Sequence, residues 1–197
     1  MLDGRLYILK HSILLCGALM LGACNPIYMG GGEPLAQMTF NHVRAYPIYV
    51  ASYELVEFVR PKENTLPEGF VSDPAVIVHD YLKSRFEASG SQGKLRAIIK
   101  DVIVQHKSVP SKNKIGAVLN VANMDHYTVR ITVALQAFGT VGHEFQSVTL
   151  TAHRNFYVSE YSSLVEREEA QMLALDRLID DLDISIRVVL KDQFKVI

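Results

Sequence analysis

The sequence contains no tryptophan and only two cysteines among its 197 residues. Both cysteines, Cys16 and Cys24, lie near the start, so residues 25–197 carry no thiol for a disulfide, a redox pair or a thiolate metal site. Neither sign of charge dominates, because 20 Lys and Arg residues face 21 Asp and Glu residues. A nucleic-acid-binding domain normally has a basic patch or a high pI, so this composition gives no indication of that class.

The common catalytic motifs are also missing. The chain has no Gly-x-Ser-x-Gly elbow and no phosphate-binding glycine-rich loop, and Gly30–Gly32 neither follows a predicted strand nor opens a predicted helix. His143-Glu144 lacks the second histidine that a zinc-protease helix needs four residues on. We therefore expect a protein that is not an enzyme and that uses no cofactor.

Histidines and aspartates are present but are not spaced as metal ligands usually are. The histidines that follow Cys24 are scattered along the chain: His42, His79, His106, His126, His143 and His153. The aspartates near the end form an acidic strip on the last predicted helix: Asp176, Asp180, Asp181 and Asp183. We expect no metal site and a solvated acidic face, with a cation or partner site as the alternative for the strip.

The first 23 residues have the layout of an export signal. Arg5 and Lys10 precede a short apolar run, residues 12–20, and small residues follow it. The run is about half of the ~20 residues that span a bilayer, so we expect no permanent transmembrane helix here. The next residues, Leu21-Gly22-Ala23-Cys24, resemble the bacterial lipobox, which implies cleavage between Ala23 and Cys24 and acylation of Cys24. The alternative is an ordinary signal with a chance cysteine.

The rest of the chain divides into a tether and one domain. Residues 24–39 contain three consecutive glycines and two prolines and show no helical or strand period, which is typical of flexible chain. Residues 40–197 are long enough for a single domain with a sizeable core.

The first half of that domain predicts a strand, a helix and a second strand. Ile48–Phe58 is rich in β-branched and aromatic residues. Asp73-Pro74 is a typical helix start, and we expect Gly90 to end the helix in the C′ position. Lys94–His106 has apolar residues on both faces, as a central strand would.

The second half predicts two more strands and a long helix. Tyr127–Phe138 and Glu144–Val158 alternate between apolar and polar residues, with a turn at 139–142 and a bulge expected between Phe145 and Val148. The last helix opens with a capping box, Ser163-Leu164-Val165-Glu166. An apolar stripe then recurs at helical spacing: Met172, Leu175, Ile179, Leu182, Ile186 and Val189. The predicted fold class is α+β, a two-layer sandwich in the order β-α-β-β-β-α, with two helices on one face of a four-stranded, mainly antiparallel sheet.

Two surfaces are candidates for binding. One is the predicted loop Ser108–Asp125, which is long for a connection between antiparallel strands. Its apolar residues would either fold back onto the core or contact a partner or a membrane: Ile115, Val118, Leu119, Val121 and Met124. The other is the threonine-rich outer face of the sheet around Arg130, which is either solvated or a docking surface.

Several segments resemble a group of proteobacterial envelope lipoproteins whose function is unassigned. These segments are Asp73-Pro74, Tyr81–Phe86, Ala88-x-Gly90-x-x-Gly93 and the late helix through Asp180-Asp181-Leu182. The predicted architecture is also similar to that of the lipopolysaccharide-assembly lipoprotein and of the auxiliary lipoproteins of lipid-exporting ABC systems. None of these groups has an active site that could be transferred to this chain.

Together these observations predict a lipid-anchored periplasmic domain that acts as a non-catalytic scaffold or assembly factor with an envelope protein as partner. The alternative is a subunit of a secretion or lipid-transport complex, and an envelope hydrolase is the least favoured class. Asn25 follows Cys24 where an aspartate would favour inner-membrane retention in enteric-type lipoproteins, so we expect the periplasmic face of the outer membrane.

Overall fold

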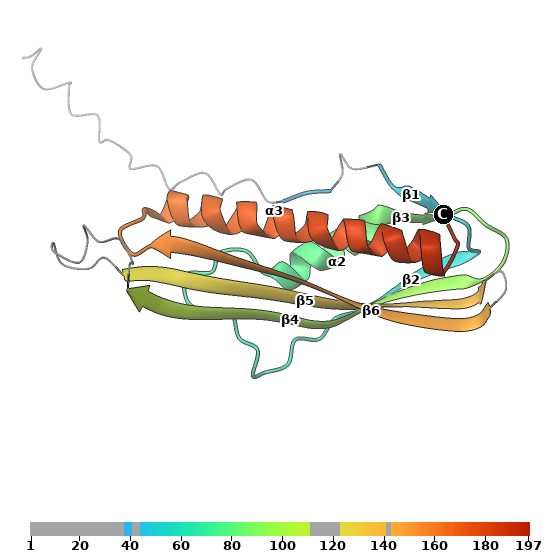
Figure 1. Cartoon of the computed structure of the whole chain (residues 1–197), viewed down its shortest axis with the longest axis horizontal. Helices are drawn as coiled ribbons and strands as arrows, with labels where there is room; N and C mark the ends of the chain where they lie inside the picture. Colours follow the sequence, from blue (N-terminus) through green and yellow to red (C-terminus); the bar gives the residue numbers. More distant parts are fainter. Residues whose placement is uncertain (1–37, 41–43, 111–122, 141–142) are drawn as a thin grey trace, which may run out of the picture. The chain divides into compact units, whose positions relative to one another are not determined.

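The protein is built around a four-stranded sheet with the strand order β2-β4-β5-β6. The computed structural model describes residues 38–40, 44–110, 123–140 and 143–197. The sheet consists of β2 (Ser52–Val56), β4 (Lys94–Pro110), β5 (Asn123–Thr140) and β6 (His143–Ser159). β2 lies parallel to β4, and the other pairs are antiparallel (Figure 1). This arrangement confirms the predicted α+β class.

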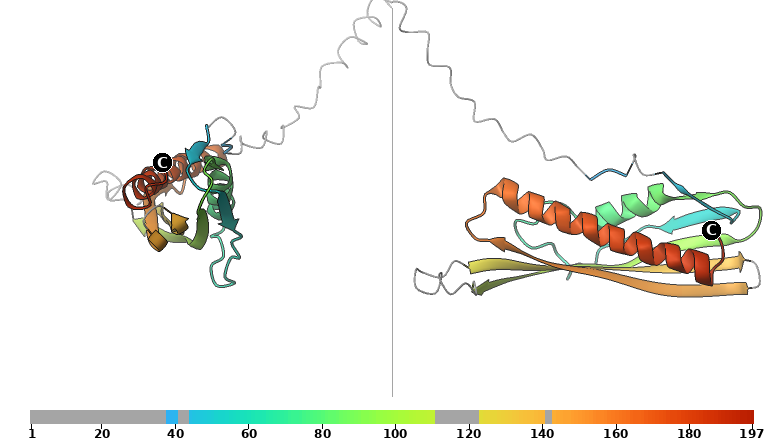
Figure 2. Two further views of the ribbon diagram at one scale, coloured as in Figure 1. Left: turned by 90° about the vertical axis from the view of Figure 1, so that its right-hand side faces the viewer. Right: turned by 45° about the horizontal axis from the view of Figure 1, so that its top comes forward.

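Two helices cover one face of this sheet and leave the other face open (Figure 2). They are α2 (Pro74–Arg85) and α3 (Leu164–Val188). The Asp73 side chain caps α2 by accepting a hydrogen bond from Ala75 N at 2.8 Å, and Pro74 occupies the first turn. α3 has the predicted capping box between Ser163 and Glu166. Within the described residues, no helix is both long and apolar enough to cross a membrane.

The core lies between the helices and the inner sheet face. The predicted apolar stripe is buried from Leu175 to Val189, with Leu182 and Ile186 fully enclosed, whereas Met172 at its start is half-buried. On β5 the inward row from Tyr127 to Ala137 is buried as well, and on β6 the alternating residues Thr149, Thr151 and His153 face outward as expected.

The predicted first strand, Ile48–Phe58, is wrong in its extent. The chain instead forms two short strands, β1 (Tyr46–Ile48) and β2, separated by a bend at residues 49–51. β1 pairs in parallel with β3 (Phe86–Ala88), which follows α2 directly. The bend lets the chain leave this small sheet and join the large one.

Gly90 does not end α2, because the helix stops at Arg85 and β3 intervenes. Its role is close packing: a Cβ atom at this position would lie 2.5 Å from the carbonyl carbon of Tyr49. The Gly90 N–H also donates to the Val50 carbonyl at 3.0 Å. The glycine is therefore needed where two backbone segments touch.

Strand lengths and irregularities also differ from the prediction. β5 and β6 pair without a register shift, so the bulge expected between Phe145 and Val148 is wrong; the shift occurs in β4 between Ile99 and Asp101. β4 and β5 extend through Pro110 and from Asn123, so both ends of the predicted loop Ser108–Asp125 are strand. The β5–β6 pairing continues to Thr140 and His143, and the two turn residues, 141–142, lie outside the described residues.

The segment that follows α3 completes the core next to the bend between β1 and β2. A π-helical turn, η1 (Val189–Gln193), follows the helix and buries Val189 and Leu190. Phe194 and Val196 are buried next, and the Tyr49 N–H donates to the Val196 carbonyl at 2.7 Å. The final residues thereby contact the bend that separates β1 from β2.

Candidate functional site

Most of the residues predicted to carry function lie outside the described part of the chain. These are the expected cleavage and lipidation residues Ala23 and Cys24 and four of the five loop residues: Ile115, Val118, Leu119 and Val121. The fifth, Met124, is described, and it is not a loop residue. It lies in β5, paired with Val109 of β4 and Ser159 of β6, and it is half-buried.

The open face of the sheet carries a row of polar side chains. The hydroxyls of Thr132 and Thr151 lie 3.3 Å apart on neighbouring strands, and Thr128 donates to Asn155 Oδ1 at 2.7 Å. Arg130 is half exposed and lies 3.9 Å from Asp101. Cross-strand pairs of this kind stabilise a sheet and fix the positions of the groups it presents. The open face is therefore polar and well ordered.

Aromatic side chains stand at both ends of this polar row. Tyr157 is 56% exposed and stacks on His126 with 4.6 Å between ring centroids. Phe145 at the other end of β6 is 53% exposed and packs against Phe138. Exposed aromatic groups fixed by a neighbour are common anchors of binding surfaces.

Three described histidines contact aromatic or aspartate side chains and not one another; His126 stacks on Tyr157, as described above. His106 stacks on Tyr127 and lies 2.9 Å from Asp125, and His79 lies 3.2 Å from Asp80. Among residues 38–40, 44–110, 123–140 and 143–197, no group of three or more His, Cys, Asp or Glu residues is arranged to hold a metal ion.

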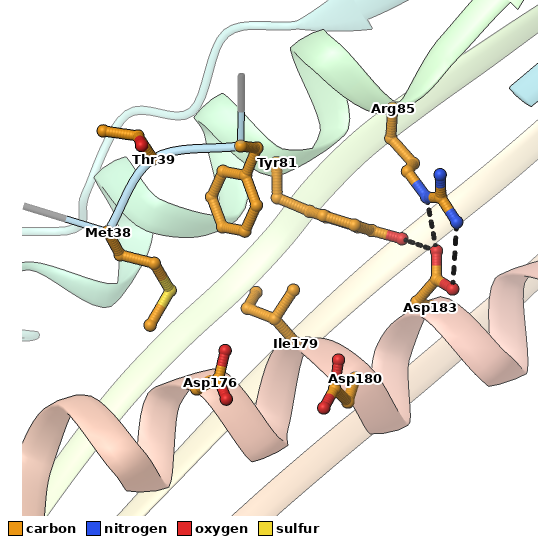
Figure 3. A pocket seen from close by; sticks show the side chains of 9 residues that line it. Met38, Thr39, Tyr81, Arg85, Asp176, Ile179, Asp180 and Asp183 are labelled. Atoms are coloured by element: carbon orange, nitrogen blue, oxygen red, sulfur yellow. Dashed lines mark hydrogen bonds and ion pairs between the residues drawn. The ribbon is translucent and has the colours of Figure 1, made fainter. Parts of the chain in front are cut away.

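A small cleft lies between α2, α3 and residues 38–40 (Figure 3). Its volume is about 240 Å³. The side chains that line it are Met38, Thr39, Phe40, Tyr81, Arg85, Asp176, Ile179, Asp180 and Asp183. Asp176 and Asp180 are exposed, whereas Asp183 points toward Arg85 and Tyr81.

Asp183 is the centre of a partly buried network, so the solvated acidic face predicted for the strip is wrong at this residue. Its carboxylate accepts hydrogen bonds from Arg85 Nε at 2.7 Å and from the Tyr81 hydroxyl at 2.6 Å. Arg187 Nε lies 2.9 Å away, and Arg85 Nη1 donates to the Arg44 carbonyl at 2.6 Å. The network joins α2, α3 and the chain segment that precedes β1.

The electrostatics of this network are those of a structural tie. Burial disfavours the charged form of Asp183, but the hydrogen bonds from Arg85 and Tyr81 hold its pKa below the usual value. Burial also raises the pKa of Tyr81, and its hydrogen bond to Asp183 raises it further. Because the carboxylate stays ionised and the phenol stays protonated, neither group is poised as a general acid or base near neutral pH.

A second tie fixes the turn between β6 and α3. Arg167 Nη1 donates to Asp125 Oδ2 at 2.7 Å, and Arg167 Nη2 donates to the carbonyls of Ser159 and Glu160. Hydrogen bonds from Arg167 and His106 lower the pKa of Asp125. Sequence reasoning missed both ties, since Asp125 and Arg167 are 42 residues apart and Arg85 and Asp183 are 98 apart. No local pattern connects such pairs.

Comparison with protein-family models and with curated proteins gives no match. Among solved structures, the chain is similar to a minor lipoprotein from Acinetobacter baumannii, with 13% identity, a TM-score of 0.34 and coverage of 75% of this chain and 96% of that one. It is also similar to the rare lipoprotein B from Shewanella oneidensis, with 17% identity, a TM-score of 0.29 and coverage of 71% and 98%.

Proposed function

We propose that this chain is a lipid-anchored periplasmic domain that acts as a non-catalytic scaffold or assembly factor in the bacterial envelope. The observation that carries the proposal is the one-sided architecture. Both helices cover the inner face of the sheet, and the opposite face presents ordered polar and aromatic side chains to solvent. A preorganised surface of this kind can bind a protein partner without ordering new structure.

The long-range ion pairs support a non-catalytic role. Arg85–Asp183 and Arg167–Asp125 each connect segments that are far apart in sequence, one between the two helices and one at the turn before α3. These charged groups hold the elements together, and their partners are other parts of the same domain.

The membrane attachment in this proposal rests on the lipobox-like residues Leu21-Gly22-Ala23-Cys24 and the glycine-rich stretch that follows. Several acyl chains on Cys24 would hold the domain stably, because a single chain binds a bilayer only marginally. For a tether of about 15 residues with the glycine-rich sequence seen here, chain statistics predict a root-mean-square reach of roughly 20 Å. We place the domain at the periplasmic face of the outer membrane, within that distance of the lipid surface.

The anchor is tested by Cys24→Ala in the full chain. We expect loss of labelled-palmitate incorporation and accumulation of the uncleaved precursor, because a lipoprotein signal peptidase acts only on the acylated cysteine. Continued palmitate labelling of the alanine variant would contradict the anchor, and so would an unlabelled parent chain that still fractionates with membranes.

The scaffold role is tested by placing negative charge at the centre of the open face. The double substitution Arg130→Glu and Thr132→Glu changes the centre of β5 on this face, and Val76→Glu, on an exposed position of α2, is the control. Each protein is recovered from detergent-solubilised envelopes, and the proteins that accompany it are compared by mass spectrometry. We expect the open-face variant alone to lose the accompanying proteins while its melting temperature matches that of the control. Identical recovery from both variants would exclude the open face as the docking surface.

A further inference from the structure

β6 is a long edge strand that lacks most of the features that usually interrupt an edge; its inward-pointing charge, Arg154, is paired with Asp181 of α3. It spans 17 residues, and within the described residues it pairs with β5 alone, in one continuous register. Its sequence, His143–Ser159, contains no proline, glycine or lysine. Natural edge strands are normally interrupted by such residues or by bulges, because an uninterrupted edge is a template for another strand.

The opposite edge of the sheet is covered over the first part of β4, residues 94–102. β2 is only five residues long, and beyond it β4 contains the register shift at Ile99/Asp101. The loop after β2 lies against this part of β4: Arg60 donates to the Val102 carbonyl at 3.3 Å and Asn64 donates to Asp101 at 3.1 Å. Within the described residues, β6 is therefore the longer continuous edge, open over its whole length, whereas β4 is open only beyond Val102.

An exposed apolar stripe on α3 lies beside the open edge. Leu173, Ile184 and Val188 are each about half exposed, and their spacings of eleven and four residues place them on one side of the helix. Arg177 lies on the same side, and its carbonyl accepts a hydrogen bond from Arg154 of β6 at 3.3 Å. The Asp181 side chain, one turn from both Arg177 and Ile184, pairs with Arg154 of β6, so the part of the stripe at Ile184 and Val188 borders the side of α3 that faces β6. α2 contacts α3 on another side, through Asp183.

We propose that this edge binds a second copy of the same chain, with the two β6 strands antiparallel about a twofold axis through Thr151. Directly opposed residues of a sheet point to the same face, and along β6 the odd-numbered residues share one face and the even-numbered residues the other. In a pair of β6 strands, each residue must therefore oppose one of the same parity, so the two residue numbers add up to an even number. A sum of 302 places Phe145 opposite Tyr157, so each of the two exposed aromatic residues gains an aromatic partner. The charged residues Glu144 and Arg154 face Val158 and Val148, so no like charges oppose each other.

The apolar stripe adds to the same interface. Arg154 lies beside residues 177–181 of α3, since it also pairs with Asp181. Thr151 is three residues from Arg154 along β6, which is about 10 Å. The same distance along α3 corresponds to about seven residues. α3 runs back along β6 after a short turn, so Ile184 and Val188 lie nearest the axis. Apolar residues at the centre of an interface usually contribute most of its affinity.

The proposal makes the oligomeric state of the full chain in mild detergent the first measurement. We expect a dimer by sedimentation, and Ile184→Glu should raise the dissociation constant of the dimer by at least about tenfold. The control, Val76→Glu, introduces the same charge at a similarly exposed apolar residue of α2 and should leave the constant unchanged. Melting curves of both variants check that the fold is intact.

Oxidative cross-linking tests the register itself. Thr151→Cys should form a disulfide-linked dimer, because the two copies of residue 151 face each other within the Cα separation that a disulfide allows. Thr149→Cys alone should not, since its two copies would be offset by four residues, about 13 Å. A mixture of Thr149→Cys and His153→Cys should again cross-link. The unsubstituted chain supplies the background from Cys16 and Cys24.

The dimer does not depend on the scaffold role, because its measurement uses this chain alone. A monomer at every concentration would overturn the proposal, and so would a dimer that survives Ile184→Glu with no cross-link at residue 151. Cross-linking of Thr151→Cys to a different protein in envelopes, without the homodimer, would also overturn it and would identify a foreign strand as the occupant.

Discussion

The carboxylate of Asp183 on α3 lies 2.7 Å from Nε of Arg85 on α2, and both side chains are at least 86% withdrawn from solvent. This ion pair connects the two helices that cover the sheet, and through the Arg44 carbonyl it also holds the segment that precedes β1. Removing one partner of a buried pair leaves the other charge uncompensated, which is more costly than losing an exposed pair.

Asp183→Asn should therefore lower the free energy of unfolding by about 3–5 kcal/mol at neutral pH. The folded state holds the pKa of Asp183 below its ordinary value of 3.8, so this stability is present above that pH. It is lost as the pH falls below about 4 and through the lowered pKa. Urea unfolding of parent and variant from pH 7 to pH 2 should show the two curves converging in acid.

The matched control for that experiment is Asp181→Ala. Asp181 is half exposed and pairs with Arg154, and exposed ion pairs contribute only about 0–1 kcal/mol. We expect this variant to be nearly silent. An Asp181 effect as large as that of Asp183 would mean that burial is not what distinguishes the two carboxylates.

Leu182→Ala should be among the most damaging substitutions in α3. The side chain is fully buried in the middle of the apolar stripe, and truncating a core leucine costs about 2–5 kcal/mol. The expected outcome is a lower melting temperature and a low steady-state level of the protein. Leu164→Ala, at the exposed start of the same helix, should change both little.

Gly90→Ala tests the close approach of two backbone segments. The added methyl group would lie 2.5 Å from the Tyr49 carbonyl carbon and 2.7 Å from the Val50 nitrogen, and neither atom can move without displacing the bend. Overpacking of this kind typically costs about 1–3 kcal/mol. Denaturant melts should show the loss for Gly90→Ala and not for Ser91→Ala, at an exposed neighbour.

The predicted partner loop is tested by replacing Leu119 and Val121 together with serine. If these residues contact a partner, the melting temperature should stay unchanged while recovery of accompanying envelope proteins falls, because a few apolar anchors dominate such interfaces. If the segment is a core flap, the domain itself should be destabilised and any loss of recovery should follow from that. The two measurements on one variant separate these alternatives.

What could be predicted from the sequence is what short-range patterns determine. The capping box at Ser163, the stripe through Leu182 and the two-residue period of β5 each depend on residues within a turn or two of each other. These local rules were sufficient for the fold class and for the order of the large elements.

What could not be predicted depends on contacts between distant segments. β3 exists because Phe86 pairs with Tyr46, and Gly90 is required because Tyr49 lies against it. In the sequence, Asp183 is one of several aspartates in an acidic strip, and only the packing of α2 against α3 pairs it with Arg85. No local spacing contains these pairings.

The contact between Tyr49 and Val196 connects the first strands of the domain to its last residues. The bend after β1 donates a hydrogen bond from the Tyr49 N–H to the Val196 carbonyl, and Leu190, Phe194 and Val196 are buried in the core. A chain shortened before Phe194 would lose this acceptor and two buried side chains, so it should melt at a lower temperature than the full chain. Residues 194–196 are thus a structural part of the domain, and a tag joined directly behind them would need a spacer to leave the bend undisturbed.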